Sequence, residues 1–205
     1  MISTKKLILA TRNKHKELEI TNLFSETGIN IVNLDQFPDI GEIEETGKTL
    51  HENALIKARE VYEITGLPTL ADDTGLEVDS LDGAPGVYSA RYAGLNSSYN
   101  DNLNKLLSDL KPYKDEIERT ARFKTVMSFV NNITELSEFG IIEGIITLNR
   151  VGDNGFGYDS IFKPKNLGVT FAQMTEDEKN KISHRGLALK KIKDKIIRIF
   201  NKESV

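Results

Sequence analysis

The sequence predicts a single α/β domain over residues 1–205, with a mixed, twisted sheet and flanking helices. Three observations support this fold class. Short apolar runs alternate with longer segments of helical periodicity, which is typical of a sheet covered by helices. Capping sequences and glycines mark where the helices begin and end. The length of 205 residues and the 39% hydrophobic content are enough to bury a substantial core without disulfides.

The N-terminal part predicts strand, turn, helix, strand and loop, in that order. Residues 7–10 form an apolar run, typical of a buried strand, that ends in a polar turn. Apolar residues recur at near-helical spacing from Lys14 onward, and residues 29–34 predict a second short strand. Residues 35–48 are acidic, contain glycine and lack an apolar period, so they predict a loop.

The next segment predicts a capped helix and then two short strands. Thr49 and Glu52 have the spacing of a capping box, and apolar residues continue one helical face until a glycine and a proline end the helix. Residues 69–71 predict a strand that ends in the turn-like sequence 72–75. Residues 76–78 predict a separate strand.

The C-terminal half continues the same alternation of strands and helices. The elements expected there are an irregular loop at 81–94, a helix at 98–110, antiparallel strands at 120–130 and 138–149, a glycine-rich loop at 152–158, a capping box at Thr175 and Glu178, and a last helix through 192–200.

The composition excludes several classes of protein. The absence of cysteine excludes disulfides, Cys-ligated zinc and thiol catalysis. A net charge of −4 argues against a nucleic-acid partner, because nucleic-acid-binding proteins present a basic surface to the phosphate backbone. The first ten residues are too short and too charged for a signal peptide, and no apolar run approaches the roughly 20 residues that span a bilayer. We therefore expect a cytoplasmic protein without a membrane partner.

The first candidate for chemistry follows the first predicted strand. A helix N-terminus offers free backbone N–H groups and a partial positive charge, which suit a phosphate. A simpler interpretation is a capped helix with solvated lysines. The segment is Thr11-Arg12-Asn13-Lys14-His15-Lys16.

The second candidate is a set of four carboxylates, Glu44, Glu45, Asp72 and Asp73. Mg²⁺ takes oxygen ligands, and two adjacent like charges after a strand favour a bound cation. The alternative is a polar turn, in which aspartate is common.

Two further candidates lie toward the C-terminus. In Gly155-Phe156-Gly157-Tyr158-Asp159 the glycines permit close approach to a ligand, and an aromatic ring can stack on a base. The alternative is a tight hairpin with buried aromatics. Lys179, His184 and Arg185 can donate to a phosphate or a carbonyl, or can belong to a solvated helix start capped by Ser183.

Taken together, these stretches resemble one family, the inosine/xanthosine triphosphate pyrophosphatases, which remove non-standard purine nucleotides. The resemblance covers about residues 7–189. Five motifs occur in the family's order, and five in sequence are far more specific than any one alone. They are residues 10–16, 70–76, 83–91, 155–159 and 178–186.

The resemblance implies roles for the matching residues. Thr11, Asn13 and Lys16 would hold the triphosphate, and Thr74 would be a further substrate contact. Asp73 would be the catalytic carboxylate and a Mg²⁺ ligand, completed by Glu45, with Glu44 as the other candidate. Arg12 stands where the family often has a small residue, so we expect it to point outward. The base pocket and its wall would be formed by Phe156, Gly157, Tyr158, Asp159, Lys179, His184 and Arg185.

The resemblance also implies an activity and an assembly. We expect hydrolysis of ITP, dITP and XTP to the monophosphate and pyrophosphate, in an elongated two-lobed homodimer with a central cleft. Asp73, with Asp72 close by, would orient or deprotonate water, and Lys16 and Lys57 would stabilise the leaving pyrophosphate. Donors from His184 or Arg185 would select a 6-oxo purine. The alternatives are a pyrophosphatase for modified pyrimidine nucleotides and a non-catalytic nucleotide-binding module.

Overall fold

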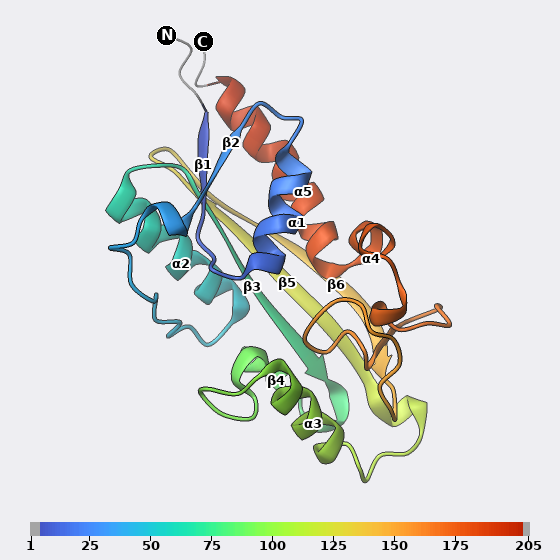
Figure 1. Ribbon diagram of the computed structural model, residues 1–205. Helices are drawn as coiled ribbons and strands as arrows, with labels where there is room; N and C mark the ends of the chain where they lie inside the picture. The colour runs from blue at the N-terminus through green and yellow to red at the C-terminus, as the bar shows by residue number, and fades with distance from the viewer. Residues whose placement is uncertain (1–4, 203–205) are drawn as a thin grey trace. The chain divides into compact units, whose positions relative to one another are not determined.

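The computed structural model describes residues 5–202 and confirms the α/β class with a mixed sheet (Figure 1). The strands are β1 (Lys6–Leu9), β2 (Asn30–Asn33), β3 (Thr69–Val78), β4 (Pro85–Gly86), β5 (Thr120–Val130), β6 (Glu135–Ile146) and β7 (Phe162–Pro164). The α-helices are α1 (Lys14–Phe24), α2 (Leu50–Thr65), α3 (Tyr99–Asp109), α4 (Glu176–Ile182) and α5 (His184–Lys202).

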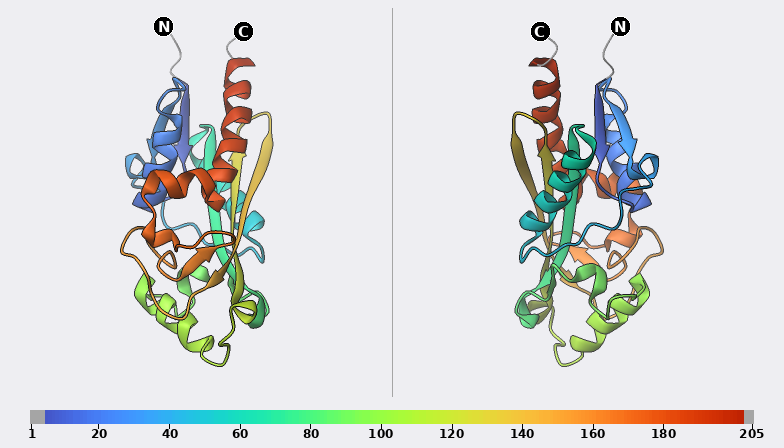
Figure 2. Two further views of the ribbon diagram at one scale, coloured as in Figure 1. Left: turned by 90° about the vertical axis from the view of Figure 1, so that its right-hand side faces the viewer. Right: turned by 90° about the vertical axis from the view of Figure 1, so that its left-hand side faces the viewer.

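The sheet order is β2-β1-β3-β5-β6-β7, and β4 pairs with β3. β1 is parallel to both β2 and β3, whereas β4 is antiparallel to β3 and β7 is antiparallel to β6. β5 and β6 form a long hairpin, closed by a hydrogen bond from the Asn131 N–H to the Thr134 carbonyl at 3.1 Å (Figure 2). The sheet is therefore mixed, as expected, with both parallel and antiparallel pairs.

The chain divides into two compact units. The first comprises the residues up to Asp73, Val126–Phe139 and the residues from Ala188 onward. The second comprises Thr74–Thr125 and Gly140–Leu187. The elongated shape and the central cleft that the family resemblance implies stay predictions.

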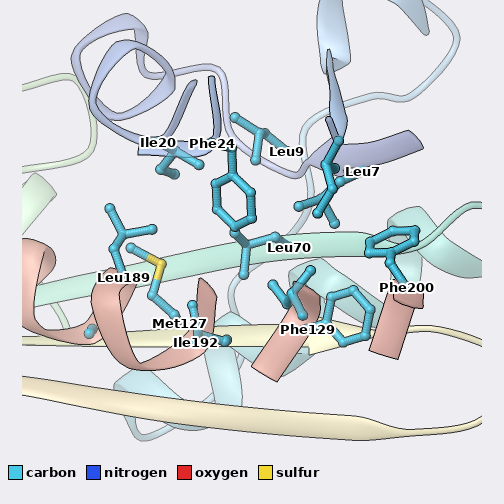
Figure 3. Packing of buried hydrophobic residues seen from close by; sticks show 13 residues of the cluster. Leu7, Leu9, Ile20, Phe24, Leu70, Met127, Phe129, Leu189, Ile192 and Phe200 are labelled. Carbon is cyan, nitrogen blue, oxygen red and sulfur yellow. The ribbon is translucent and has the colours of Figure 1, made fainter. Parts of the chain in front are cut away.

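The core of the first unit has two halves because successive residues of a strand point to opposite faces. On β1, Leu7 and Leu9 pack with α1 and α5, whereas Ile8 packs with α2. On β3, Leu70 joins the α1 and α5 side, and Ala71 joins the α2 side. Figure 3 shows the first of these two clusters, in which side chains of α1, α5, β1, β3 and β5 meet.

The second unit has its own core, with an arginine built into it. Side chains of β3, α3, β5 and β7 form a cluster that includes stacked aromatic rings. Arg119 is only 3% exposed, and its guanidinium donates to four backbone carbonyls at 2.6–3.0 Å. These bonds satisfy most of its donors, so we assign Arg119 a structural role.

Most expected elements are confirmed, including the capping boxes that begin α2 and α4. The division of residues 69–78 into two strands around a turn is wrong, because these residues form the single strand β3. Asp72 and Asp73 therefore lie inside a strand and not after one. β6 begins at Glu135, three residues earlier than expected, and the loop at 81–94 contains the short strand β4. None of the described helices is long and apolar enough to cross a bilayer.

Candidate active site

The two adjacent aspartates of β3 are buried on opposite faces of the strand. Asp72 is 1% exposed and Asp73 is 7% exposed. The alternation that sends Leu70 toward α1 and Ala71 toward α2 continues, so Asp72 faces α1 and Asp73 faces α2. Asp72 accordingly pairs with Lys16 of α1, with 2.7 Å between Oδ2 and Nζ. A buried carboxylate needs such a partner.

Asp73 is surrounded by side chains from α2 and from the preceding loop. Lys57 Nζ lies 3.8 Å from Asp73 Oδ1 and 2.6 Å from Glu45 Oε1. Asn53 Nδ2 donates to Asp73 Oδ2 at 3.2 Å. Glu44 is exposed, so it is Glu45 that faces the cluster. The structure thus brings Glu45 and Asp73 to one ammonium group, although they are 28 positions apart in the chain.

The position of Asp73 in this buried cluster shifts its pKa upward. Burial is the largest cause, and it raises the pKa from 3.8 to about 6, with further raising by Glu45 and Asp72 and opposing contributions from Lys57 and Lys16. Burial would lower the pKa of Lys57, but Asp73, Asp72 and Glu45 outweigh burial and raise it. Lys57 is therefore charged at neutral pH. Asp73 has a pKa suited to accepting a proton near neutrality.

The segment from Thr11 to Lys16 forms the capped start of α1. Asn13 is the N-cap, and its side chain accepts from the backbone N–H groups of His15 and Lys16 at 3.1 and 3.4 Å. Thr11 Oγ1 accepts from the Asn13 N–H. The simpler interpretation of a capped helix therefore describes the backbone here, and Lys16 is the member of the segment that reaches the buried cluster.

Arg12, Lys14 and His15 are all exposed, as we expected for Arg12. Arg12 donates to the Ile40 carbonyl and lies 3.9 Å from Asp35. Lys14 binds the carboxylates of Asp35 and Glu17. These contacts of Arg12 and Lys14 tie the start of α1 to the region after β2.

The donors around Asp73 fit Mg²⁺. Within residues 5–202, no three or more His, Cys, Asp or Glu side chains form a closed metal cage. Mg²⁺ does not require one, because it is usually held by one or two carboxylates together with substrate phosphates and water. Glu45 and Asp73 supply two hard oxygen ligands that face the same cation, which in this structure is the ammonium of Lys57.

A second cluster lies in the second unit and surrounds Phe156. Lys179 Nζ lies 4.9 Å and Arg185 Cζ 5.6 Å from the centre of its ring. Asp159 holds this loop, since its Oδ2 accepts from the Phe156 N–H at 2.8 Å and from Lys179 Nζ at 2.6 Å. A side chain at Gly155, whose φ is +75°, would overlap that carboxylate. The result is a half-buried aromatic ring beside two cations.

Tyr158 and His184 have buried positions in the same unit. The Tyr158 hydroxyl donates to the Ser89 carbonyl at 2.9 Å, and burial raises its pKa. The His184 ring stacks on Phe123, with 4.5 Å between ring centroids and 10° between planes. Gly157 adopts a φ of +63°, which turns the loop between Phe156 and Tyr158. Of the expected base-binding residues, Phe156 is the aromatic one that is partly exposed.

Several residues that the sequence did not single out belong to these clusters. Asn53 contacts Asp73. Thr74, an expected substrate contact, bonds through its hydroxyl to that of Thr125 at 2.7 Å. The Tyr99 ring lies 5.8 Å from that of Phe156. One signal for Asn53 was available: it precedes Lys57 by four residues and therefore shares a helix face with it.

The fold and the buried cluster define an α/β protein with carboxylates and lysines paired at one site. The chain belongs to the Ham1 family, whose model matches residues 7–195. It is 48% identical over 195 residues to the dITP/XTP pyrophosphatase of Thermoanaerobacter sp. (strain X514), covering 94% of this chain and 97% of that one. It is 42% identical over 198 residues to the dITP/XTP pyrophosphatase of Listeria monocytogenes serovar 1/2a, covering 96% and 97%.

Solved structures agree with the family assignment. The Staphylococcus aureus Ham1 protein matches with a TM-score of 0.83 and 34% identity, covering 97% of this chain and 100% of that one. A HAM1 protein from Coxiella burnetii matches with a TM-score of 0.85 and 38% identity, covering 97% and 99%. The family therefore accounts for the fold over nearly the whole chain.

Proposed function

We propose that this protein hydrolyses the non-canonical purine nucleoside triphosphates ITP, dITP and XTP to the nucleoside monophosphate and pyrophosphate. One geometric observation carries the proposal. Glu45 and the buried Asp73 converge on Lys57, which puts two oxygen ligands and a cation in one place. Relatives that match nearly the full chain are dITP/XTP pyrophosphatases, which supports the same reaction.

Mg²⁺ is the metal we assign to this site, with Glu45 and Asp73 as its protein ligands. When bound, it supplies charge neutralisation to the phosphate oxygens. A cation held by Glu45 and Asp73 would compete with the Lys57 ammonium for these carboxylates. The adjacent phosphates of a nucleoside triphosphate are the natural acceptors for that ammonium.

The chemical step is in-line attack of a water oxygen on the α-phosphorus. The new P–O bond forms as the bond from the α-phosphorus to the bridging oxygen breaks, and pyrophosphate leaves with that oxygen. The water proton passes to the Asp73 carboxylate, which acts as the general base. Lys16 and Lys57 balance charge on the phosphates. Asp72 serves chiefly by holding Lys16.

The Phe156 cluster is the part of the chain that we assign to the base. A purine stacked on an aromatic ring contributes about 1–3 kcal/mol. Lys179 and Arg185 lie beside the ring, and their cationic groups can donate hydrogen bonds but cannot accept them. They therefore favour a base with a carbonyl over one with an amine. A 6-amino purine would leave such donors unpaired, at a cost of roughly 1–3 kcal/mol each. Inosine and xanthosine both present the 6-oxo group.

A triphosphate panel tests the proposal. ITP, XTP, GTP, ATP and a modified pyrimidine triphosphate are each assayed for monophosphate and pyrophosphate, with and without Mg²⁺. We expect release of pyrophosphate from ITP and XTP that depends on Mg²⁺ and is lost in Asp73→Asn. The matched control is Asp194→Asn on the exposed side of α5, which should retain turnover.

Each alternative predicts a different result in the same panel. Preference for the modified pyrimidine would favour the related pyrophosphatase, and binding without pyrophosphate release would favour a nucleotide-binding module. A preference for ATP would refute the selectivity we propose. We further propose that the protein is a homodimer and acts in the cytoplasm, where its substrates arise, with no nucleic-acid or membrane partner. Sedimentation at several concentrations tests the dimer.

A further inference from the structure

The Asn53 side chain is fully buried, and both its amide nitrogen and its amide oxygen form hydrogen bonds. Its exposure is 0%, and it lies in the first turns of α2. Its Nδ2 donates to Asp73 Oδ2 at 3.2 Å. Its Oδ1 accepts from the Gly47 N–H at 2.8 Å. One side chain therefore connects the carboxylate of β3 to the loop that carries Glu45, two residues before Gly47.

The loop packs closely against the start of α2 at Gly47. A Cβ added to Gly47 would lie 2.6 Å from Asn53 Oδ1, 2.6 Å from Glu52 Cβ and 2.9 Å from the Asn53 backbone nitrogen. Gly47 is therefore held against α2 by contact as well as by its hydrogen bond. Lys57 follows Asn53 by about one helical turn and binds Glu45 of the same loop.

We propose that Asn53 is a positioning residue for the metal site: it holds Asp73 and the Glu45 loop in the arrangement that faces a divalent cation. This inference rests on the proposed function. An uncharged amide suits the position because it can donate to a carboxylate and accept from a backbone N–H at once. Aspartate could not donate to Asp73, and leucine could do neither.

A purely structural role for Asn53 makes a different prediction, and Asn102 provides the comparison. Asn102 is 1% exposed and sits in the first turns of α3. It accepts from the Ala93 N–H at 2.7 Å and donates to the Ala90 carbonyl at 3.0 Å. Asn102 also accepts from the Ser97 hydroxyl at 2.9 Å, so it holds three groups where Asn53 holds two. The two asparagines match in burial, but Asn102 has no carboxylate of the candidate site among these partners.

The test compares Asn53→Leu with Asn102→Leu. Binding of Mn²⁺, used as a probe for the Mg²⁺ site, is measured by electron paramagnetic resonance without nucleotide. The thermal midpoint in EDTA and the Mg²⁺ concentration for half-maximal pyrophosphate release are measured in parallel. Both variants should lower the thermal midpoint. Only Asn53→Leu should weaken Mn²⁺ binding, by about tenfold or more, and raise the Mg²⁺ requirement similarly, as is typical when a group that orients a metal ligand is removed.

A second variant covers the case in which Asn53→Leu does not fold. Gly47→Ala retains Asn53 and Asp73 but puts a Cβ against Asn53 Oδ1 and the backbone of α2, which disrupts the packing of the loop on the helix. It should therefore weaken Mn²⁺ binding in the same way. Wild-type Mn²⁺ affinity in Asn53→Leu or in Gly47→Ala would overturn the inference. Equal weakening in Asn102→Leu, or a wild-type protein that binds no Mn²⁺, would overturn it too.

The metal titration separates this inference from the proposed function. It contains no nucleotide, so it reports on Asn53 whether or not a triphosphate is hydrolysed. A wild-type protein that binds Mn²⁺ but releases no pyrophosphate would refute the proposed function and leave the role of Asn53 to be decided by the variants.

Discussion

Replacing Asp73 with asparagine should make the metal-free protein more stable at neutral pH while abolishing turnover. The folded state raises the pKa of Asp73 from 3.8 to about 6, mainly through burial. Between these values the folded protein holds a proton that the unfolded chain has released. The contribution of Asp73 to stability is therefore greatest below about pH 4 and is lost as the pH rises to about 6.

The size of this effect follows from the shift. About two pKa units correspond to roughly 3 kcal/mol of unfolding free energy lost at pH 7.5 relative to pH 4. Asparagine does not ionise and can still accept from Asn53, so it avoids the loss. For a protein of this length, about 3 kcal/mol is equivalent to about 6–12 °C in Tm.

Urea unfolding in EDTA measures the difference directly. Asp73→Asn should exceed wild type by up to about 3 kcal/mol at pH 7.5 and by little at pH 4. Asp194→Asn, at an exposed position, should stay within about 0.5 kcal/mol of wild type at both pH values. A variant that is no more stable than wild type at pH 7.5, or that gains equally at both pH values, would refute the reasoning.

Three further predictions address the two clusters. Lys57→Met removes the ammonium shared by Glu45 and Asp73 and should lower kcat for ITP about 100-fold or more, measured as pyrophosphate release. Phe156→Ala removes the aromatic ring beside two cations and should raise KM for ITP about tenfold with a smaller change in kcat; an unchanged KM would argue against base stacking there. Gly155→Ala puts a side chain at a φ of +75° against Asp159 and should lower the unfolding free energy by about 1–3 kcal/mol in urea, whereas wild-type stability would show that the loop can move aside.

The elements set by local signals could be predicted from the sequence. Thr49 and Thr175 begin helices as expected because capping depends on residues only three positions apart. The break expected at Asp72–Gly75 was wrong for the opposite reason. Aspartate and glycine favour turns locally, but pairing along the sheet and the lysines that meet the aspartates come from distant parts of the chain.

The candidate site shows the same limit. The carboxylates and lysines were recognisable as residue types, and the geometry brings Glu45, Lys57 and Asp73 together. Which of Glu44 and Glu45 faces the cluster depends on how the loop packs on α2, and adjacent loop residues carry no such signal. Asn53 escaped notice because an asparagine within an amphipathic helix is ordinary until its two partners are known.

α2 presents Asn53 and Lys57 on one side, and Thr49 sets where that helix starts. Each residue added to a helix turns everything after it by about 100° around the axis. An insertion or deletion between Thr49 and Asn53 would turn both the amide and the ammonium away from β3, even if the helix itself remained intact. One between Asn53 and Lys57 would turn the ammonium alone, so the length of this segment is fixed by the site as well as by the helix.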